Sequence, residues 1–266
     1  MSANRIKLLL AVSAIVLFVL LFLAPKTRDA KPDEVKPGAG MPTAATLDVY
    51  LTTAEKNLSK DVFTKYKALQ VDDSIIAFWT ALRRPDLAAY FVEKKAAASK
   101  SAATWFEAGN RYYYAVQFMQ DQSESSALMQ SAARAFSKGL ELEPTNTDAK
   151  IMLASTYVDS GSDPMKGISI LREIEKVDSN NVKLQLSFAF FSLRSGQLDK
   201  AIARFKKVLV IDPSYIEAYI RLAEVYEQQG NKEGTIEMLE LYASKTEDAT
   251  ARTEIEQVIK QLKETN

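Results

Sequence analysis

Residues 181–215 read NVKLQLSFAFFSLRSGQLDKAIARFKKVLVIDPSY and carry the pattern of two helices joined by a short turn. In the first half apolar residues recur at helical spacing, and this helix should end at Ser195-Gly196, because glycine tolerates the left-handed backbone of a helix end. The second helix should begin behind Asp199, and Pro213 should end it because proline has no amide hydrogen to donate. The stretch therefore predicts one antiparallel helix pair.

The same plan recurs 34 residues further on. Ile216 lies 34 residues after Val182, and Gly230 lies 34 residues after Gly196. A helix pair repeated every 34 residues resembles the tetratricopeptide repeat (TPR). The resemblance implies an all-α fold, a right-handed superhelical solenoid of antiparallel helix pairs. An apolar run near the N-terminus places one transmembrane helix before it.

About four copies of the repeat are expected within residues 102–246. The first copy, which opens with Trp105 and Tyr112, is about 11 residues longer than the family's period. The surplus falls at residues 119–130 and would form either a longer helix pair or a protruding loop. Small residues should mark where the two helices of each repeat cross, because a larger side chain would push them apart. These small residues are Gly109, Ala154, Ala189 and Ala223.

The remaining chain divides by composition. We assign residues 1–7 to a short tail, 8–24 to a transmembrane anchor, 25–43 to a flexible linker, 44–101 to degenerate or capping helical repeats, and 247–266 to a C-terminal capping helix. The linker contains four of the eight prolines and should stay extended. Pro85 should open a helix, since the first turn tolerates proline.

The anchor is predicted from an apolar run between Leu8 and Ala24 in which only Ser13 is polar. At about 1.5 Å per residue the run spans roughly 25 Å, close to the lower limit for a bilayer. Lys7 and Lys26 flank it and can reach the headgroups. A cleaved signal peptide is the closest alternative, but small residues are missing where the cut would fall.

The side of the membrane is harder to assign. Lysines and arginines are more numerous after the apolar run than before it, which favours a cytoplasmic repeat domain. A short basic tail before the first apolar run is, however, typical of bacterial signal-anchors. We expect a single-pass protein of the bacterial inner membrane with the TPR domain in the periplasm, and the cytoplasmic side is the alternative.

Composition argues against catalysis. The chain has no cysteine and no histidine, and its 34 basic and 34 acidic residues balance. Disulfides, thiolate nucleophiles and the commonest metal ligand and general base are therefore missing. We expect no catalytic residues, no cofactor and no metal, and we expect no nucleic-acid partner because basic residues do not cluster. Charged residues such as Glu175 and Arg204 are interpreted as solvated.

The resemblance implies a peptide-binding groove lined by the first helix of each repeat. By register the groove would contain Phe106, Asn110, Tyr113, Tyr114, Ile151, Ser155, Val158, Leu186, Phe190, Leu193, Arg194, Ile220, Glu224 and Glu227. One TPR subclass clamps a C-terminal carboxylate with a Lys/Asn/Arg set, and only Asn110 fits it, so we reject that mode. The apolar, aromatic lining favours an amphipathic helix or another apolar segment as ligand. Alternatively, Phe190 and Leu193 pack on the next repeat.

The sequence thus predicts a non-enzymatic, membrane-anchored scaffold that mediates protein–protein interaction in the assembly of an envelope complex. The alternative is a chaperone-like holdase that binds apolar segments of client proteins in the groove. Repeats of this kind often self-associate, so a homo-oligomer stays open.

Overall fold

The computed structural model describes residues 51–69 and 73–264, which contain α-helices, one short 3-10 helix and no β-strand. Residues 51–56 are helical. The later helices are α3 (Lys60–Lys67), α4 (Asp73–Ala81), α5 (Pro85–Ser99), α6 (Ala102–Ala115), η1 (Val116–Phe118), α7 (Gln122–Leu142), α8 (Thr147–Ser160), α9 (Pro164–Val177), α10 (Val182–Arg194), α11 (Leu198–Ile211), α12 (Glu217–Gln228), α13 (Lys232–Lys245) and α14 (Ala249–Glu264).

The predicted anchor (8–24) and linker (25–43) lie outside the described residues. Within the described ranges, no helix combines the length and apolar character that crossing a bilayer requires. The all-helical, TPR-like arrangement is confirmed for the part that the structure describes. The right-handed sense of the superhelix stays a prediction.

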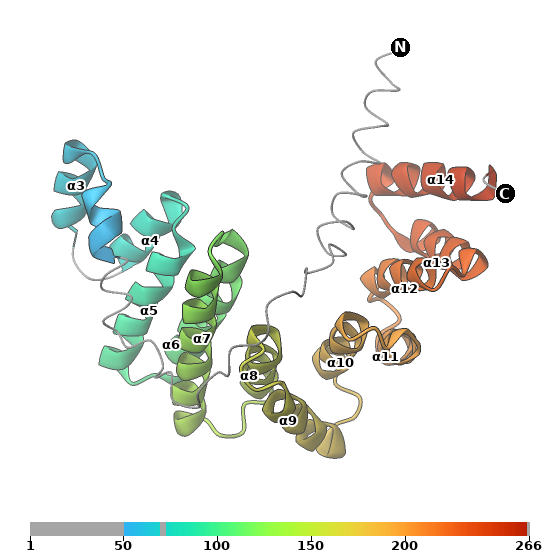
Figure 1. The fold of residues 1–266 in the computed structure, drawn as a ribbon, viewed down its shortest axis with the longest axis horizontal. Coiled ribbons are helices and arrows are strands. Elements are labelled where there is room, and N and C mark those ends of the chain that lie inside the picture. Colours follow the sequence, from blue (N-terminus) through green and yellow to red (C-terminus); the bar gives the residue numbers. More distant parts are fainter. Residues whose placement is uncertain (1–50, 70–72, 265–266) are drawn as a thin grey trace, which may run out of the picture. The chain divides into compact units, whose positions relative to one another are not determined.

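Helices that follow one another in the chain pack as pairs, α6 with α7, α8 with α9, α10 with α11 and α12 with α13, and α14 packs on α13 (Figure 1). In the stretch 181–215, α10 ends at Arg194 and Gly196 adopts φ 71° as the turn requires. Helix α11 begins at Leu198, so Asp199 lies in its first turn and not before it. Gly161 and Gly230 adopt the same left-handed conformation, at φ 67° and 71°.

Asparagine is the N-cap residue of one helix in each of three repeats. Asn146, Asn181 and Asn231 each accept a hydrogen bond from the amide three residues later, at 2.9, 3.1 and 2.9 Å. These bonds satisfy backbone donors that have no partner inside the helix. The caps therefore fix where α8, α10 and α13 begin.

The surplus of the first repeat forms a longer second helix. Residues 116–118 make the 3-10 turn η1, and Asp121 caps α7 by accepting from the amides of Ser123 (2.7 Å) and Glu124 (3.2 Å). Helix α7 then runs for 21 residues. Of the two alternatives for residues 119–130, a longer helix is the one observed.

The helix crossings lie at the predicted small residues. A Cβ on Gly109 would stand 2.8 Å from the ring of Phe136. Ala154 faces Gly167, where a Cβ would stand 2.5 Å from the Ala154 carbonyl oxygen. Ala189 and Ala223 are buried in the cluster that joins α10 to α14. Close approach thus confirms the register at Gly109 and Ala154, and burial agrees with it at Ala189 and Ala223.

Substituting leucine for Ala189 should lower the free energy of unfolding by about 1–3 kcal/mol, because the fully buried site has no room for three more carbons. A thermal melt of the variant beside the native chain measures the effect. Ala203→Leu, on an exposed position of α11, is the control and should leave the melt nearly unchanged. An unchanged melt for Ala189→Leu as well would contradict the register.

A polar network joins α9, α10 and α11. The fully buried Gln185 donates to the Ser179 carbonyl oxygen at 2.7 Å and accepts from the Arg204 guanidinium at 2.8 Å. Arg204 also pairs with Glu175 and lies 4.4 Å from the centroid of the Phe188 ring. The interpretation of Arg204 and Glu175 as solvated residues is therefore wrong, since the stacking of successive repeats turns them toward each other.

Replacing Glu175 by glutamine should destabilise the protein in a pH-dependent way. The Arg204 hydrogen bond lowers the pKa of the Glu175 carboxyl below its ordinary value of 4.5. This carboxylate thus stabilises the fold above its unfolded pKa, and the stabilisation is lost as the pH falls through the lower folded pKa. We expect a loss of about 0.5 kcal/mol at neutral pH, small because the pair is partly exposed, and no difference once the pH is low enough to protonate the carboxylate in the folded protein. Urea denaturation of both proteins across this range measures it, and a pH-independent difference would contradict the assignment.

Candidate functional site

The predicted groove residues share one side of the first helices α6, α8, α10 and α12. We call this side the first-helix face. Its members lie three residues before, and one, four or five residues after, the small residue at the helix crossing. Because an α-helix turns every 3.6 residues, these positions fall on one side of each helix.

Exposure differs among the members. Tyr114 and Phe190 are 57% and 40% exposed, and both are large apolar side chains. Arg194 and Glu227 are exposed as well. The half-buried members are Phe106, Asn110, Tyr113, Val158, Leu186, Leu193, Ile220 and Glu224. The face thus offers exposed aromatic surface at α6 and at α10.

Two predicted groove residues are buried. Ile151 is 3% exposed and Ser155 is 8% exposed, so neither offers a surface to a ligand. Both lie on α8. This helix contacts α6, α7, α9 and α10 and is therefore covered on several sides. We reassign these two residues from the groove to the core.

A carboxylate that the sequence analysis missed links three first helices. The Tyr113 hydroxyl on α6 donates to Asp159 on α8, and Arg194 on α10 forms an ion pair with the same carboxylate. The Asp159 side chain is only 16% exposed. Burial, and then the Asp159 charge, raise the pKa of Tyr113, so the phenol keeps its proton at neutral pH. Register could have found Asp159, since it precedes Gly161 by two residues as Arg194 precedes Gly196.

Phe190 combines both roles that the sequence left open. Its ring meets Phe205 of α11 edge-on at 5.4 Å between centroids, and the Arg221 guanidinium of α12 lies 5.7 Å from its centroid. Arg221 is in turn paired with Glu224 at 2.9 Å. Phe190 therefore packs on its neighbours while keeping a large exposed area.

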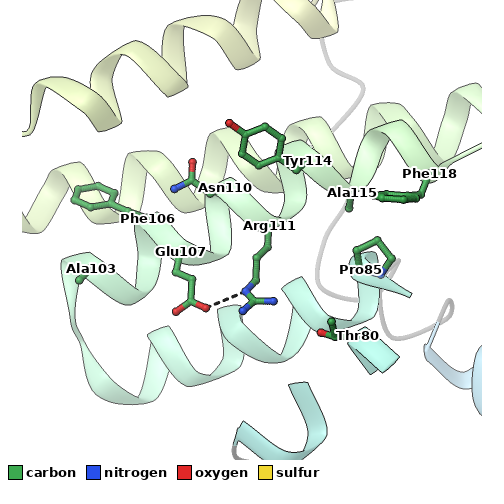
Figure 2. A pocket seen from close by; sticks show the side chains of 10 residues that line it. All are labelled: Thr80, Pro85, Ala103, Phe106, Glu107, Asn110, Arg111, Tyr114, Ala115 and Phe118. Atoms are coloured by element: carbon green, nitrogen blue, oxygen red, sulfur yellow. Dashed lines mark hydrogen bonds and ion pairs between the residues drawn. The ribbon is translucent and has the colours of Figure 1, made fainter. Parts of the chain in front are cut away.

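A hollow of about 650 Å³ lies beside α6 (Figure 2). It is lined by Thr80, Pro85, Ala103, Phe106, Glu107, Asn110, Arg111, Tyr114, Ala115 and Phe118. Three predicted groove residues meet here, namely Phe106, Asn110 and Tyr114. Phe118 was missed, and at 60% exposed it is a prominent apolar side chain. It lies in η1, after the regular repeat pattern of α6 has ended, so the register gave no signal for it.

The described residues include no group of three or more histidine, cysteine, aspartate or glutamate side chains placed to hold a metal ion. The side chains of the candidate site are apolar, aromatic and amide groups, together with charged groups that pair within the protein.

The comparisons with known proteins agree with the helical-repeat fold. A family model described as TPR repeat matches residues 193–230, which run from the end of α10 through α12. A comparison with curated proteins found no match. Among solved structures, a thermophilic TPR protein of Thermus thermophilus is similar over 70% of this chain and 96% of its own, with 17% identity and a TM-score of 0.51.

The structure of PilW, a widely conserved type IV pilus biogenesis factor, is similar over 79% of this chain and 96% of its own, with 14% identity and a TM-score of 0.50. At these identities the likeness is one of fold. The repeat match and the fold together support a helical repeat protein of the TPR type.

Proposed function

We propose that this chain is a non-enzymatic scaffold, anchored in a membrane by residues 8–24, that holds partner proteins along the first-helix face during assembly of an envelope complex. The observation that carries the proposal is the exposed aromatic surface of Tyr114 and Phe190 on that face. Aromatic side chains dominate binding energies at protein interfaces because they bury a large area at little entropic cost.

The inter-repeat contacts support this use of the face. Asp159 joins α6, α8 and α10, and Arg221 joins α10 to α12 through the Phe190 ring. A surface whose helices are tied to one another loses little conformational freedom when a ligand binds, and this preserves affinity. The charges on the face are largely paired within the protein, so apolar contact would supply most of the binding energy.

Photo-crosslinking in cells tests the scaffold. A photoreactive phenylalanine analogue at position 114 or 190 should crosslink to a discrete partner that mass spectrometry identifies. The matched control is position 177, where the 90% exposed Val177 ends α9 outside the face, and it should not yield the same partner. Crosslinks from position 177 alone would overturn the assignment of the face.

The membrane anchor and the periplasmic location are part of the proposal. They are supported by the apolar run of residues 8–24 and the short basic tail before it. Protease added to intact spheroplasts should digest the repeat domain while a cytoplasmic marker survives. Protection of the domain until the membrane is opened would place it in the cytoplasm instead.

A holdase is the second candidate. It is favoured by the separation of the exposed apolar side chains, with Phe118 beside α6 and Phe190 on α10, because unfolded clients offer many apolar segments at once. Suppression of the aggregation of a model client, together with diffuse crosslinking to many proteins, would favour the holdase. A single stoichiometric partner would favour the scaffold.

A further inference from the structure

The hollow beside α6 is built from more than the repeat. Thr80 lies in the last turn of α4, Pro85 opens α5, and Phe118 comes from η1, directly before the insertion of the first TPR copy. Helix α4 ends at Ala81. Two residues later Arg83 adopts a left-handed φ of 55°, and the chain turns into α5. The hollow therefore combines one side of α6 with three residues from segments that the 34-residue period does not define.

The charges in the hollow neutralise each other. Glu107 and Arg111, one helical turn apart on α6, form an ion pair at 2.9 Å (Figure 2). The other lining residues are uncharged. A charged ligand group would lose its hydration here without gaining an unpaired partner, which is unfavourable. The lining is thus complementary to an uncharged, apolar group.

Asn110 supplies a polar group that has no use inside the protein. Its carboxamide projects from α6 between Phe106 and Tyr114 and makes no hydrogen bond within the described residues (Figure 2). A carboxamide both donates and accepts, so it can exchange hydrogen bonds with a peptide group. In a helical ligand the backbone groups are already paired, whereas an extended segment leaves them free.

We infer that the hollow beside α6 binds an extended segment of a partner protein, with an uncharged aromatic or branched aliphatic side chain seated between Phe106, Tyr114 and Phe118 and the segment's backbone held by Asn110. The inference rests on the proposed function and specifies the ligand of one part of the face. The volume of about 650 Å³ lies within the range of about 300–1,000 Å³ that ligand sites occupy.

Peptide selection on the full-length chain tests the inference. Displayed random peptides of about 12 residues, long enough to lie extended across the hollow, are selected on the native protein, and their affinities are measured by fluorescence anisotropy. Selected peptides should share one aromatic or branched aliphatic residue, and replacing it by lysine should weaken binding about tenfold or more.

Substitutions of residues that line the hollow should weaken the binding of the same selected peptides. Phe118→Ala should weaken binding about tenfold, and Asn110→Ala should weaken it about threefold or more. Ala103→Phe, at an exposed lining position, should fill the hollow and block binding without disturbing the core. Leu142→Ala is the matched control, since Leu142 is a 51% exposed apolar residue outside the hollow, and it should bind like the native chain.

The remaining outcomes separate this inference from the proposed function. Peptides whose affinity is unchanged by the hollow variants but lowered by Phe190→Ala would overturn the inference and leave the first-helix face intact as a binding surface. Peptides whose affinity is unchanged by the hollow variants and by Phe190→Ala would overturn both the inference and the proposed function. Displacement of the selected peptides by a synthetic peptide of residues 25–50 would assign the hollow to a segment of this chain, which also overturns a partner protein as occupant.

Discussion

Replacing Phe136 by alanine is expected to lower the free energy of unfolding by about 3–5 kcal/mol. The ring is fully buried in the cluster that joins α3 to α8, and it fills the space left by the missing side chain of Gly109. Its removal deletes a large apolar contact and opens a cavity that two crossing helices prevent from collapsing. Urea denaturation followed by circular dichroism measures the loss, and Phe190→Ala, at a 40% exposed ring, should cost clearly less.

The Gly109 contact provides a second check on the same site. In the native chain, Gly109→Ala places a methyl group 2.8 Å from the Phe136 ring and should destabilise. In the Phe136→Ala background the clash is gone, so the same change should stabilise α6 by up to about 1 kcal/mol through helix propensity. A double-mutant cycle that shows no coupling between the two positions would mean that they do not meet.

The positions of the helices were predictable because their causes are local. Gly196 and Gly230 mark helix ends by conformation, asparagine caps mark helix starts, and the 3.6-residue period marks the buried side. The crossings followed from residue size alone, since Ala154 and Ala189 stand where close approach is needed. The length of α7 was not settled, because residues 119–130 carry both loop-forming and helix-forming residues.

The candidate site was predictable only as a set of helix positions. Register places Ile151 and Phe190 on the same side of their helices, yet the first is buried and the second exposed, because exposure depends on which other helices cover each one. Register also failed for Phe118, which lies in η1 between α6 and the insertion. Arg204 and Glu175 were misread because their sequence neighbours do not show that they meet across two repeats.

Replacing Gly167 by valine is expected to cost about 3 kcal/mol, near the upper end for overpacking, because even its Cβ would stand 2.5 Å from the Ala154 carbonyl oxygen. That neighbour is backbone and is held in α8, so relief requires α8 and α9 to separate. Urea denaturation measures the cost. The matched control is Gly161→Ala, where nothing lies within 4 Å but φ is 67°; it should cost only about 1–2 kcal/mol, and Gly161→Asn should cost less still. A cost at Gly167 no larger than that at Gly161 would contradict the tight contact with Ala154, since Gly167 has an ordinary helical φ and no conformational reason to be glycine.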